Sequence, residues 1–211
     1  KCWGENNDGQ LGLGDTTERT TPEAVDLGSG MTAIMVSTGG AEASQAHACA
    51  VLNDGSLKCW GSDGYGQIGA DCPNGCASDK LSPTAVSIPA GSEVLQVSAG
   101  MGHTCAILDD RSLWCWGSGG SYRTGQGHQV QKETPQVVDL GQDMTALSVS
   151  AGGAHTCAIL NDGSVRCWGS DNDGQLGGSQ PSNFTSGDCP DCPVDIGTNK
   201  TALSISAGYN H

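Results

Sequence analysis

The sequence contains four near-copies of one unit, and this repetition constrains the fold more than any other feature. The tripeptide Cys-Trp-Gly recurs at steps of 57, 56 and 52 residues, with its cysteine at Cys2, Cys59, Cys115 and Cys167. This period is longer than that of most helical solenoids and close to the length of a propeller blade. Glycine supplies 33 of the 211 residues, and no window shows a sustained helical apolar stripe. The sequence predicts an all-β fold in units of approximately 1–46 (incomplete), 47–102, 103–154 and 155–211.

The charge of the chain limits its partners. Acidic side chains outnumber basic ones by 23 to 9, which gives a formal net charge of −14. A surface of this sign repels phosphate backbones and anionic membranes, so we expect no nucleic-acid partner. No apolar run approaches the roughly 20 residues that span a bilayer, so we expect no membrane insertion in this segment.

Eleven cysteines are present, and in three units a pair lies ten positions apart around a turn. With Asn161–Gly163 as a three-residue hairpin loop, Leu160 faces Ser164 and Cys157 faces Cys167. Facing residues of a non-hydrogen-bonded antiparallel pair have Cα atoms about 4.5 Å apart, which a disulfide can span. Reduced, buried cysteines are the alternative interpretation. The predicted bridges are Cys49–Cys59, Cys105–Cys115 and Cys157–Cys167.

Two positions depart from this scheme. In the middle hairpin Arg111 takes the last loop position, where the other two units have a glycine suited to left-handed backbone, so we expect a looser or different turn there. Cys2 has no partner in the chain, because its equivalent would lie ten residues upstream, before Lys1. We therefore expect further polypeptide, with another such strand, outside these residues.

Two more cysteine pairs lie in long loops, Cys72 with Cys76 and Cys189 with Cys192. Convergent motifs of this kind can bind zinc, but these lie two units apart with no histidine nearby in sequence, which favours local disulfides. Disulfides are typical of oxidising compartments, and glycosylation sequons at Asn183 and Asn199 agree with that assignment. The sequence thus predicts a secreted, extracellular or cell-surface glycoprotein without a metal or cofactor.

Each unit can be divided into four short strands, and the alternation of Leu147, Val149 and Ala151 indicates one buried strand face. The pattern S-A-G-x-x-H-T-C-A, followed by D-G-x-V-x-C-W-G and G-Q-L-G, resembles the repeat of the regulator of chromosome condensation family. The resemblance covers essentially the whole chain. It implies a β-propeller of four-stranded antiparallel blades, about four of them here and normally seven in a ring.

The same resemblance informs the choice between branches of the family. The paired cysteines look like the secreted and receptor-ectodomain branch. No loop resembles the nucleotide-exchange wedge of the nuclear member, so exchange activity on a GTPase is the least expected function.

Recurring aromatic and histidine residues have two interpretations each. A histidine row could bind metal, but a structural role between strands or blades is favoured for His47, His103, His155 and His211. Tryptophans could anchor a partner, but inter-blade packing is favoured for Trp3, Trp60, Trp116 and Trp168. The motifs at Asn6–Gly9 and Asp171–Gly174 lack the ligand spacing of a calcium loop and are predicted to be turns.

Trp114 breaks the pattern, because other units have Lys58 or Arg166 at that position, and it is a candidate contact for a protein or glycan. The insert at 178–193 is another candidate. No nucleophile elbow, phosphate loop or HExxH motif appears, so we expect no enzyme. We expect a non-catalytic extracellular propeller module that binds protein or glycan. The alternative is a self-associating structural subunit of an extracellular fibre, appendage or matrix.

Overall fold

The computed structural model describes residues 1–40, 45–71, 78–178 and 193–211. Regular structure in these residues is β apart from a three-residue 3₁₀ turn, η1 (Gly120–Tyr122). None of the described chain forms a helix long and apolar enough to cross a bilayer. The strands are β1 (Cys2–Gly4), β2 (Arg19–Glu23), β3 (Ala33–Gly39), β4 (His47–Leu52), β5 (Leu57–Gly61), β6 (Lys80–Ala85), β7 (Val94–Ala99), β8 (His103–Leu108), β9 (Leu113–Gly117), β10 (Lys132–Val137), β11 (Ala146–Ala151), β12 (His155–Leu160) and β13 (Val165–Gly169).

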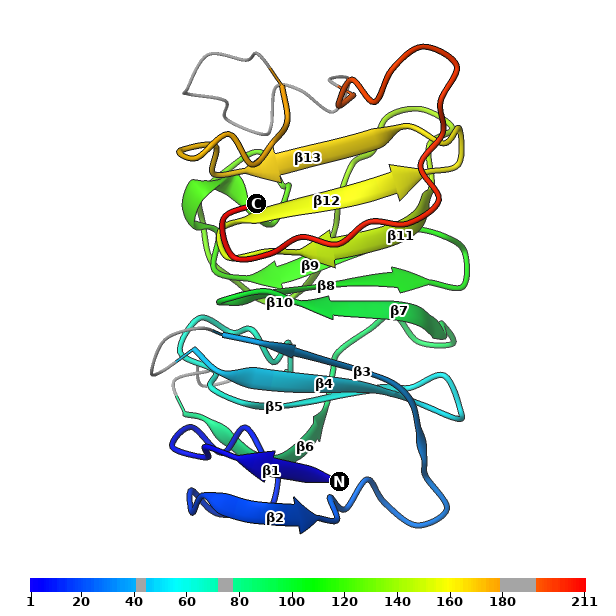
Figure 1. Ribbon diagram of the computed structural model, residues 1–211. Helices are drawn as coiled ribbons and strands as arrows, with labels where there is room; N and C mark the ends of the chain where they lie inside the picture. Colours follow the sequence, from blue (N-terminus) through cyan, green and yellow to red (C-terminus); the bar gives the residue numbers. More distant parts are fainter. Residues whose placement is uncertain (41–44, 72–77, 179–192) are drawn as a thin grey trace.

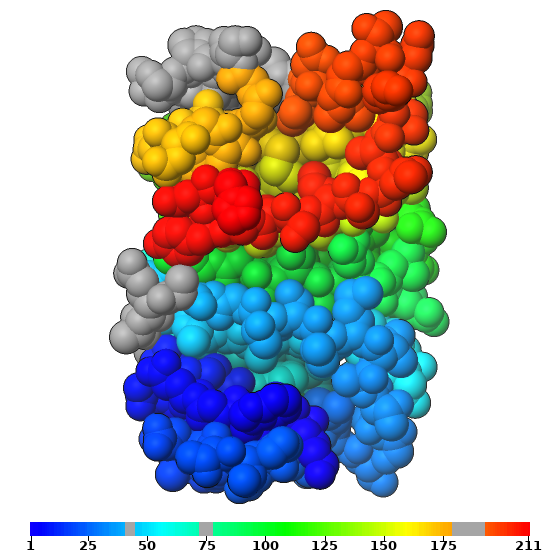
Figure 2. All heavy atoms as spheres, in the orientation of Figure 1, coloured from blue at the N-terminus to red at the C-terminus, as the bar shows by residue number. Residues whose placement is uncertain are grey.

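The strands form antiparallel sheets that stack in chain order. Two sheets have four strands, β3-β4-β5-β6 and β7-β8-β9-β10. The third contains β11, β12 and β13, with a single bridge between Arg166 and Pro193 at its fourth position, and β1 pairs with β2. Figure 1 shows the sheets as successive layers, and Figure 2 shows the layers in close contact. The predicted four-stranded antiparallel blades are confirmed.

The boundaries of the blades differ from those of the sequence units by one strand, because the last strand of each unit belongs to the next blade. β3 precedes the unit of residues 47–102 but pairs with its strand β4, and β7 and β11 likewise join the hairpin that follows them. These first strands contact one another from blade to blade and are called the inner strands below. Residues 201–207 continue the series, because the N–H of Ala202 donates to the carbonyl of Gly163 at 3.1 Å, as that of Ala146 donates to Arg111 at 3.0 Å.

The register predicted for the hairpins is confirmed. Cys157 faces Cys167 across β12 and β13, and the N–H of Leu160 donates to the carbonyl of Ser164 at 2.9 Å. The Cα atoms of each bridged pair lie 4.1 Å apart. The disulfides in the described residues are Cys49–Cys59, Cys105–Cys115 and Cys157–Cys167.

The expectation of a different turn at Arg111 is wrong. Arg111 adopts the left-handed conformation with φ of 68°, as Gly55 and Gly163 do with φ of 79° and 82°. Its N–H donates to the carbonyl of Leu108 at 2.9 Å, which is the bond that closes the other two loops. The Cys105–Cys115 disulfide fixes the pairing of the two strands, and the loop that joins them therefore keeps the same conformation as in the other hairpins.

The apolar core lies between blades. Strands β4, β8 and β12, second in each sheet, are buried along their whole length. One cluster joins Val51 and Leu57 of one blade to Val97 and Leu108 of the next. A second cluster repeats this arrangement between the following pair of blades. Burial therefore depends on stacking, as expected for a repeat protein.

The inner strands contain a feature that the sequence analysis missed. The register of β7 shifts between Val94 and Gln96 and that of β11 between Ala146 and Ser148, which are β-bulges. A bulge interrupts the two-residue alternation, so Leu147 is 48% exposed while Val149 is 2% exposed. The prediction that Leu147 shares a buried face with Val149 is therefore wrong.

Candidate functional site

The ends of the inner strands form a hollow around their glycine corners. At each corner a glycine N–H donates to the carbonyl of the histidine that opens the next strand, at 2.8 Å from Gly100 to His103 and from Gly152 to His155. The hollow has a volume of about 230 Å³ and is called the axial hollow. Its lining residues are Thr38, Gly39, Gly40, Ala99, Gly100, Met101, Ala151, Gly152, Gly153, Ala207, Gly208 and Tyr209.

The histidines beside these corners connect neighbouring blades. His47 Nε2 lies 2.9 Å from Thr104 Oγ1, and His103 Nε2 lies 2.8 Å from Thr156 Oγ1. Each threonine hydroxyl donates to a backbone carbonyl, so its oxygen accepts a hydrogen bond from the Nε2–H of the histidine. Burial lowers the pKa of His47 to about 4 and that of His103 well below its usual value. The structural role predicted for these two residues is confirmed.

Trp60, Trp116 and Trp168 pack between blades as predicted, whereas Trp3 is 60% exposed and departs from the prediction. Trp60 Nε1 donates to the carbonyl of Gln10 at 2.9 Å, and Trp116 Nε1 donates to that of Gln67 at 2.9 Å. Trp168 does the same with Arg123 at 3.1 Å. A Cβ atom at Gly12, Gly69 or Gly125 would collide with the indole of the following blade, which explains the glycine two residues after Gln10, Gln67 and Arg123.

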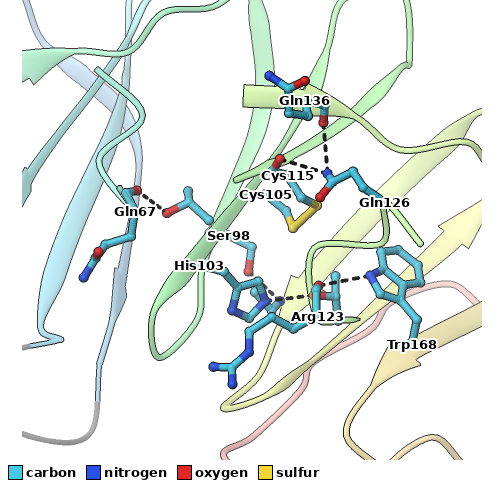
Figure 3. Close-up of a disulfide and its surroundings, with 12 residues drawn as sticks. Gln67, Ser98, His103, Cys105, Cys115, Arg123, Gln126, Gln136 and Trp168 are labelled. Carbon is cyan, nitrogen blue, oxygen red and sulfur yellow. Dashed lines mark hydrogen bonds between the residues drawn. A yellow bond between two sulfur atoms is a disulfide. The ribbon is translucent and has the colours of Figure 1, made fainter. Parts of the chain in front are cut away.

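The loop between β9 and β10 places a cation beside the axial hollow, bonded to a residue that lines it. Arg123 Nε donates to the carbonyl of Gly120 at 2.8 Å, and Nη1 donates to that of Gly153 in the hollow at 3.3 Å. Burial lowers the pKa of this guanidinium, and the phenol groups of Tyr65 and Tyr209 partly oppose the effect. Figure 3 shows the guanidinium near the His103 ring and directed away from the Trp168 indole.

The bulges place exposed aliphatic side chains along the inner strands. Leu95 and Leu147 are 41% and 48% exposed, although β7 lies between β3 and β11, and β11 lies between β7 and residues 201–207. The equivalent residues at the two ends of the series are also exposed. We call these four residues the apolar arc: Ile34, Leu95, Leu147 and Leu203.

Other predicted residues lie away from these surfaces. Trp114 is half-buried, packs against the inter-blade core and donates to Ser112 Oγ at 2.8 Å, so its role as a partner contact stays a prediction. Asn199 is exposed. The side chains of Asn6 and Asp171 accept from N–H groups five residues ahead, which confirms them as turn residues. The predictions for Cys72, Cys76, Asn183, Cys189 and Cys192, and nearly all of the 178–193 insert, lie outside the described residues.

Cys2 is the one free cysteine among the described residues. It is half-buried in a hollow of about 380 Å³ beside β1, where Trp3, Leu27 and Val36 also line the wall. Burial raises the pKa of its thiol, so the thiolate is disfavoured.

Stacked four-stranded antiparallel sheets with repeated inter-blade bonds define a β-propeller. Solved structures agree with this class. Human WBSCR16 superposes with a TM-score of 0.78 at 21% identity, over 98% of this chain and 50% of that one. The yeast protein Prp20, from Saccharomyces cerevisiae, gives a TM-score of 0.74 at 22% identity, over 92% of this chain and 45% of that one.

The family is shown by the sequence match. The regulator of chromosome condensation (RCC1) repeat matches residues 2–42, 54–107 and 110–159, and a second model of the same repeat matches 94–123 and 147–175. The chain belongs to the RCC1 repeat family. The ultraviolet-B receptor UVR8 of Arabidopsis thaliana is 29% identical over all of this chain, which spans 45% of that receptor. The human E3 ubiquitin-protein ligase HERC2 is 30% identical over 83% of this chain, which spans 4% of the ligase.

Sequence reasoning missed Arg123 and the apolar arc. An alignment of the four loops after Cys-Trp-Gly would have revealed Arg123, because the other three have Gln10, Gln67 and Gln175 at that position. The arc residues were recognisable as an aliphatic residue recurring at one position of each inner strand. Their exposure was not recognisable, because it depends on the bulges.

Proposed function

We propose that this chain is a non-catalytic, extracellular protein-binding module that contacts its partner through the apolar arc. The observation that carries the proposal is the exposure of Leu95 and Leu147 at equivalent positions of adjacent blades. Isolated exposed aliphatic residues are normal on soluble proteins, whereas contiguous apolar surface marks interaction sites. Here a bulge in each strand directs the side chain outward, and bulges commonly re-aim side chains at functional sites.

Two further observations support the parts of this proposal. Solved structures of Prp20 concern its complex with Kap60 and its binding to Gsp1p and histones, so a propeller of this fold recognises proteins. The three described disulfides suit an oxidising compartment, and the exposed sequon residue Asn199 suits secretion. The net charge of −14 disfavours a nucleic-acid partner.

The test compares two double variants of the chain secreted from eukaryotic cells. Leu95→Ser with Leu147→Ser changes the arc, and Val130→Ser with Val137→Ser removes aliphatic groups of similar exposure elsewhere. Proteins from extracellular fluid are cross-linked to each variant and quantified by mass spectrometry. Loss of two interface aliphatic groups should lower the yield of a specific partner about tenfold for the arc variant and leave the control unchanged.

The outcomes separate the competing functions. Equal partner yields from the two variants would contradict the proposal. Light scattering of the purified chain addresses self-association: oligomers that dissociate on the arc substitutions would instead support the fibre subunit. The mass of the secreted chain before and after N-glycan removal tests whether Asn199 is glycosylated.

A further inference from the structure

The loop after β9 differs from its three counterparts at the residues that give the other loops their shape. The counterparts begin with Asn or Asp, continue through glycine and then have glutamine. In this loop the corresponding residues are Gly119, Tyr122 and Arg123. Ser121 and Tyr122 both adopt left-handed backbone, with φ of 56° and 60°, where glycine is the residue normally tolerated. Ser121 and Tyr122 therefore hold a backbone conformation that costs free energy for any residue other than glycine.

The main chain of Arg123 performs the same task as that of Gln67. The carbonyl of Gln67 accepts from Trp116 and Thr104, and that of Arg123 accepts from Trp168 and Thr156. The contact between blades is therefore preserved. What differs at this position is the side chain.

The side-chain difference follows from hydrogen-bonding chemistry. Gln10 and Gln67 each turn back on their own loop, where Oε1 accepts from the N–H two residues earlier at 2.9 Å. Arginine has no acceptor and cannot make this bond. Arg123 instead extends to the next blade and donates to Gly153 at the axial hollow.

The guanidinium has unused donors and no charge partner among the described residues. Of its five N–H groups, two donate in bonds to Gly120 and Gly153. The ion pairs in the described chain involve Arg19 and Lys80, and no described carboxylate pairs with Arg123. A half-buried cation without a counter-ion is expensive, and a bound carboxylate would remove that cost through paired hydrogen bonds.

The surroundings fit a side chain of a protein better than a small molecule. Tyr65 and Tyr209, 39% and 44% exposed, lie near the guanidinium. Tyrosine and arginine are the residues most enriched at the energetic centres of protein interfaces, together with tryptophan.

We propose that Arg123, beside the axial hollow and near Tyr65 and Tyr209, binds a single side-chain carboxylate of a partner protein. This inference rests on the proposed protein-binding function and supplies a second, electrostatic contact separate from the apolar arc. In a strongly acidic chain, a single oriented guanidinium selects where and in which orientation a carboxylate of the partner can dock.

The experiment is an NMR titration of the isotope-labelled chain with N-acetylglutamate methylamide, with N-acetylglutamine methylamide as the neutral probe. Arg123→Gln introduces the residue found in the other loops, so the blade is expected to fold. Arg111→Gly removes the same charge from an exposed hairpin loop outside the site. The signals followed are Arg123 Nε–H and the backbone amides of Gly153 and Tyr209.

We expect saturable shifts with the carboxylate probe in the original chain and in Arg111→Gly. The loss of a charged hydrogen bond should raise Kd about tenfold or more in Arg123→Gln, and the neutral probe should bind as weakly to the original chain. Unchanged Kd in Arg123→Gln would overturn the proposal. So would shifts that never saturate and spread evenly over all basic residues, since these indicate adventitious binding of an anion.

Two comparisons separate failure of this site from failure of the proposed function. If Arg123→Gln leaves carboxylate binding unchanged while the arc variant still loses its partner, the site is wrong and the function stands. If carboxylate binding depends on Arg123 while the arc variant keeps its partner, the site stands and docking through the arc is wrong.

Discussion

At the scale of single residues, Arg111 shows how neighbours determine a local conformation. Its backbone is left-handed, which L-residues avoid because Cβ approaches the following carbonyl oxygen. The Cys105–Cys115 bridge and the bond from Ala146 to the Arg111 carbonyl keep it there. The tertiary contacts therefore override the local preference.

Arg111→Gly should raise the free energy of unfolding by about 0.5–1 kcal/mol, because glycine adopts this conformation without steric cost but loses more entropy on folding. Urea unfolding followed by tryptophan fluorescence measures the change. A variant with equal or lower stability would show that Arg111 gains compensating contacts that outweigh its strain. Gly163→Ala serves as the converse substitution and should be destabilising, since its Cβ would meet Thr201 Cγ2 at 2.5 Å.

At the scale of the element, the sharp corner between inner strand and hairpin is the most demanding part of the blade. A Cβ atom at Gly100 would collide with the His103 ring and with the carbonyl of Gly152 in the next blade. The corner therefore couples two constraints, the turn within one blade and the distance to its neighbour. Gly100 is required because a side chain would not fit there, and not because its backbone is left-handed.

Gly100→Ala should lower the free energy of unfolding by about 1–3 kcal/mol, the usual cost of forcing an extra methyl group into a packed site. Gly64→Ala is the matched control, because no atom lies within 4 Å of a Cβ at Gly64. Denaturant midpoints for both variants test the prediction. If both substitutions have the same small effect, the corner is less tightly packed than the structure shows.

The elements also show which parts of the molecule can be predicted from sequence. The hairpin register follows from counting outward from Asn161–Gly163, because a disulfide requires its two cysteines to face each other. Leu147 could not be placed in this way, since a bulge adds one residue to one strand and its position depends on contacts between blades. The position of Arg123 at the hollow was likewise hidden, because Arg123 and Gly153 are 30 residues apart in the chain and belong to different blades.

At the scale of the whole molecule, the same few bonds recur at the two junctions that join the sheets β3–β6, β7–β10 and β11–β13. A histidine bonds to a threonine, a tryptophan to a carbonyl and a serine to a backbone N–H, as Ser98 Oγ accepts from Ala151 at 2.9 Å. Stability of such an array is approximately a sum over blades and junctions. The titration of buried histidines therefore affects several junctions together.

The unfolding free energy should fall as the pH is lowered from about 6.5 towards 4. The pKa of His47 is about 4 in the folded chain and ordinarily 6.5, so the unfolded chain binds more protons in this window. At about pH 5 this difference corresponds to about 2 kcal/mol for His47, and His103 adds to it in the same direction. Carboxyl groups such as Asp110, whose pKa is lowered from 3.8 by bonds to Ser112, also stabilise the folded chain, and this contribution to the free energy of unfolding is lost at lower pH.

Urea midpoints at about pH 7.5 and about pH 5 measure the effect, and His47→Gln serves as the control. Gln can still donate to Thr104 but does not titrate, so this variant should show a smaller loss between the two values. A loss of the same size in both proteins would assign the pH dependence to other groups.

The placement of the disulfides has a mechanical consequence. Each of the three described bridges joins two strands of one blade, and each junction between blades in the described chain is held by hydrogen bonds and apolar packing. Under tension applied to its ends, the chain should therefore part at the junctions and lengthen one blade at a time. Each released blade should increase the end-to-end length of the chain by less than its count of residues would give, because the segment between its two bonded cysteines cannot extend.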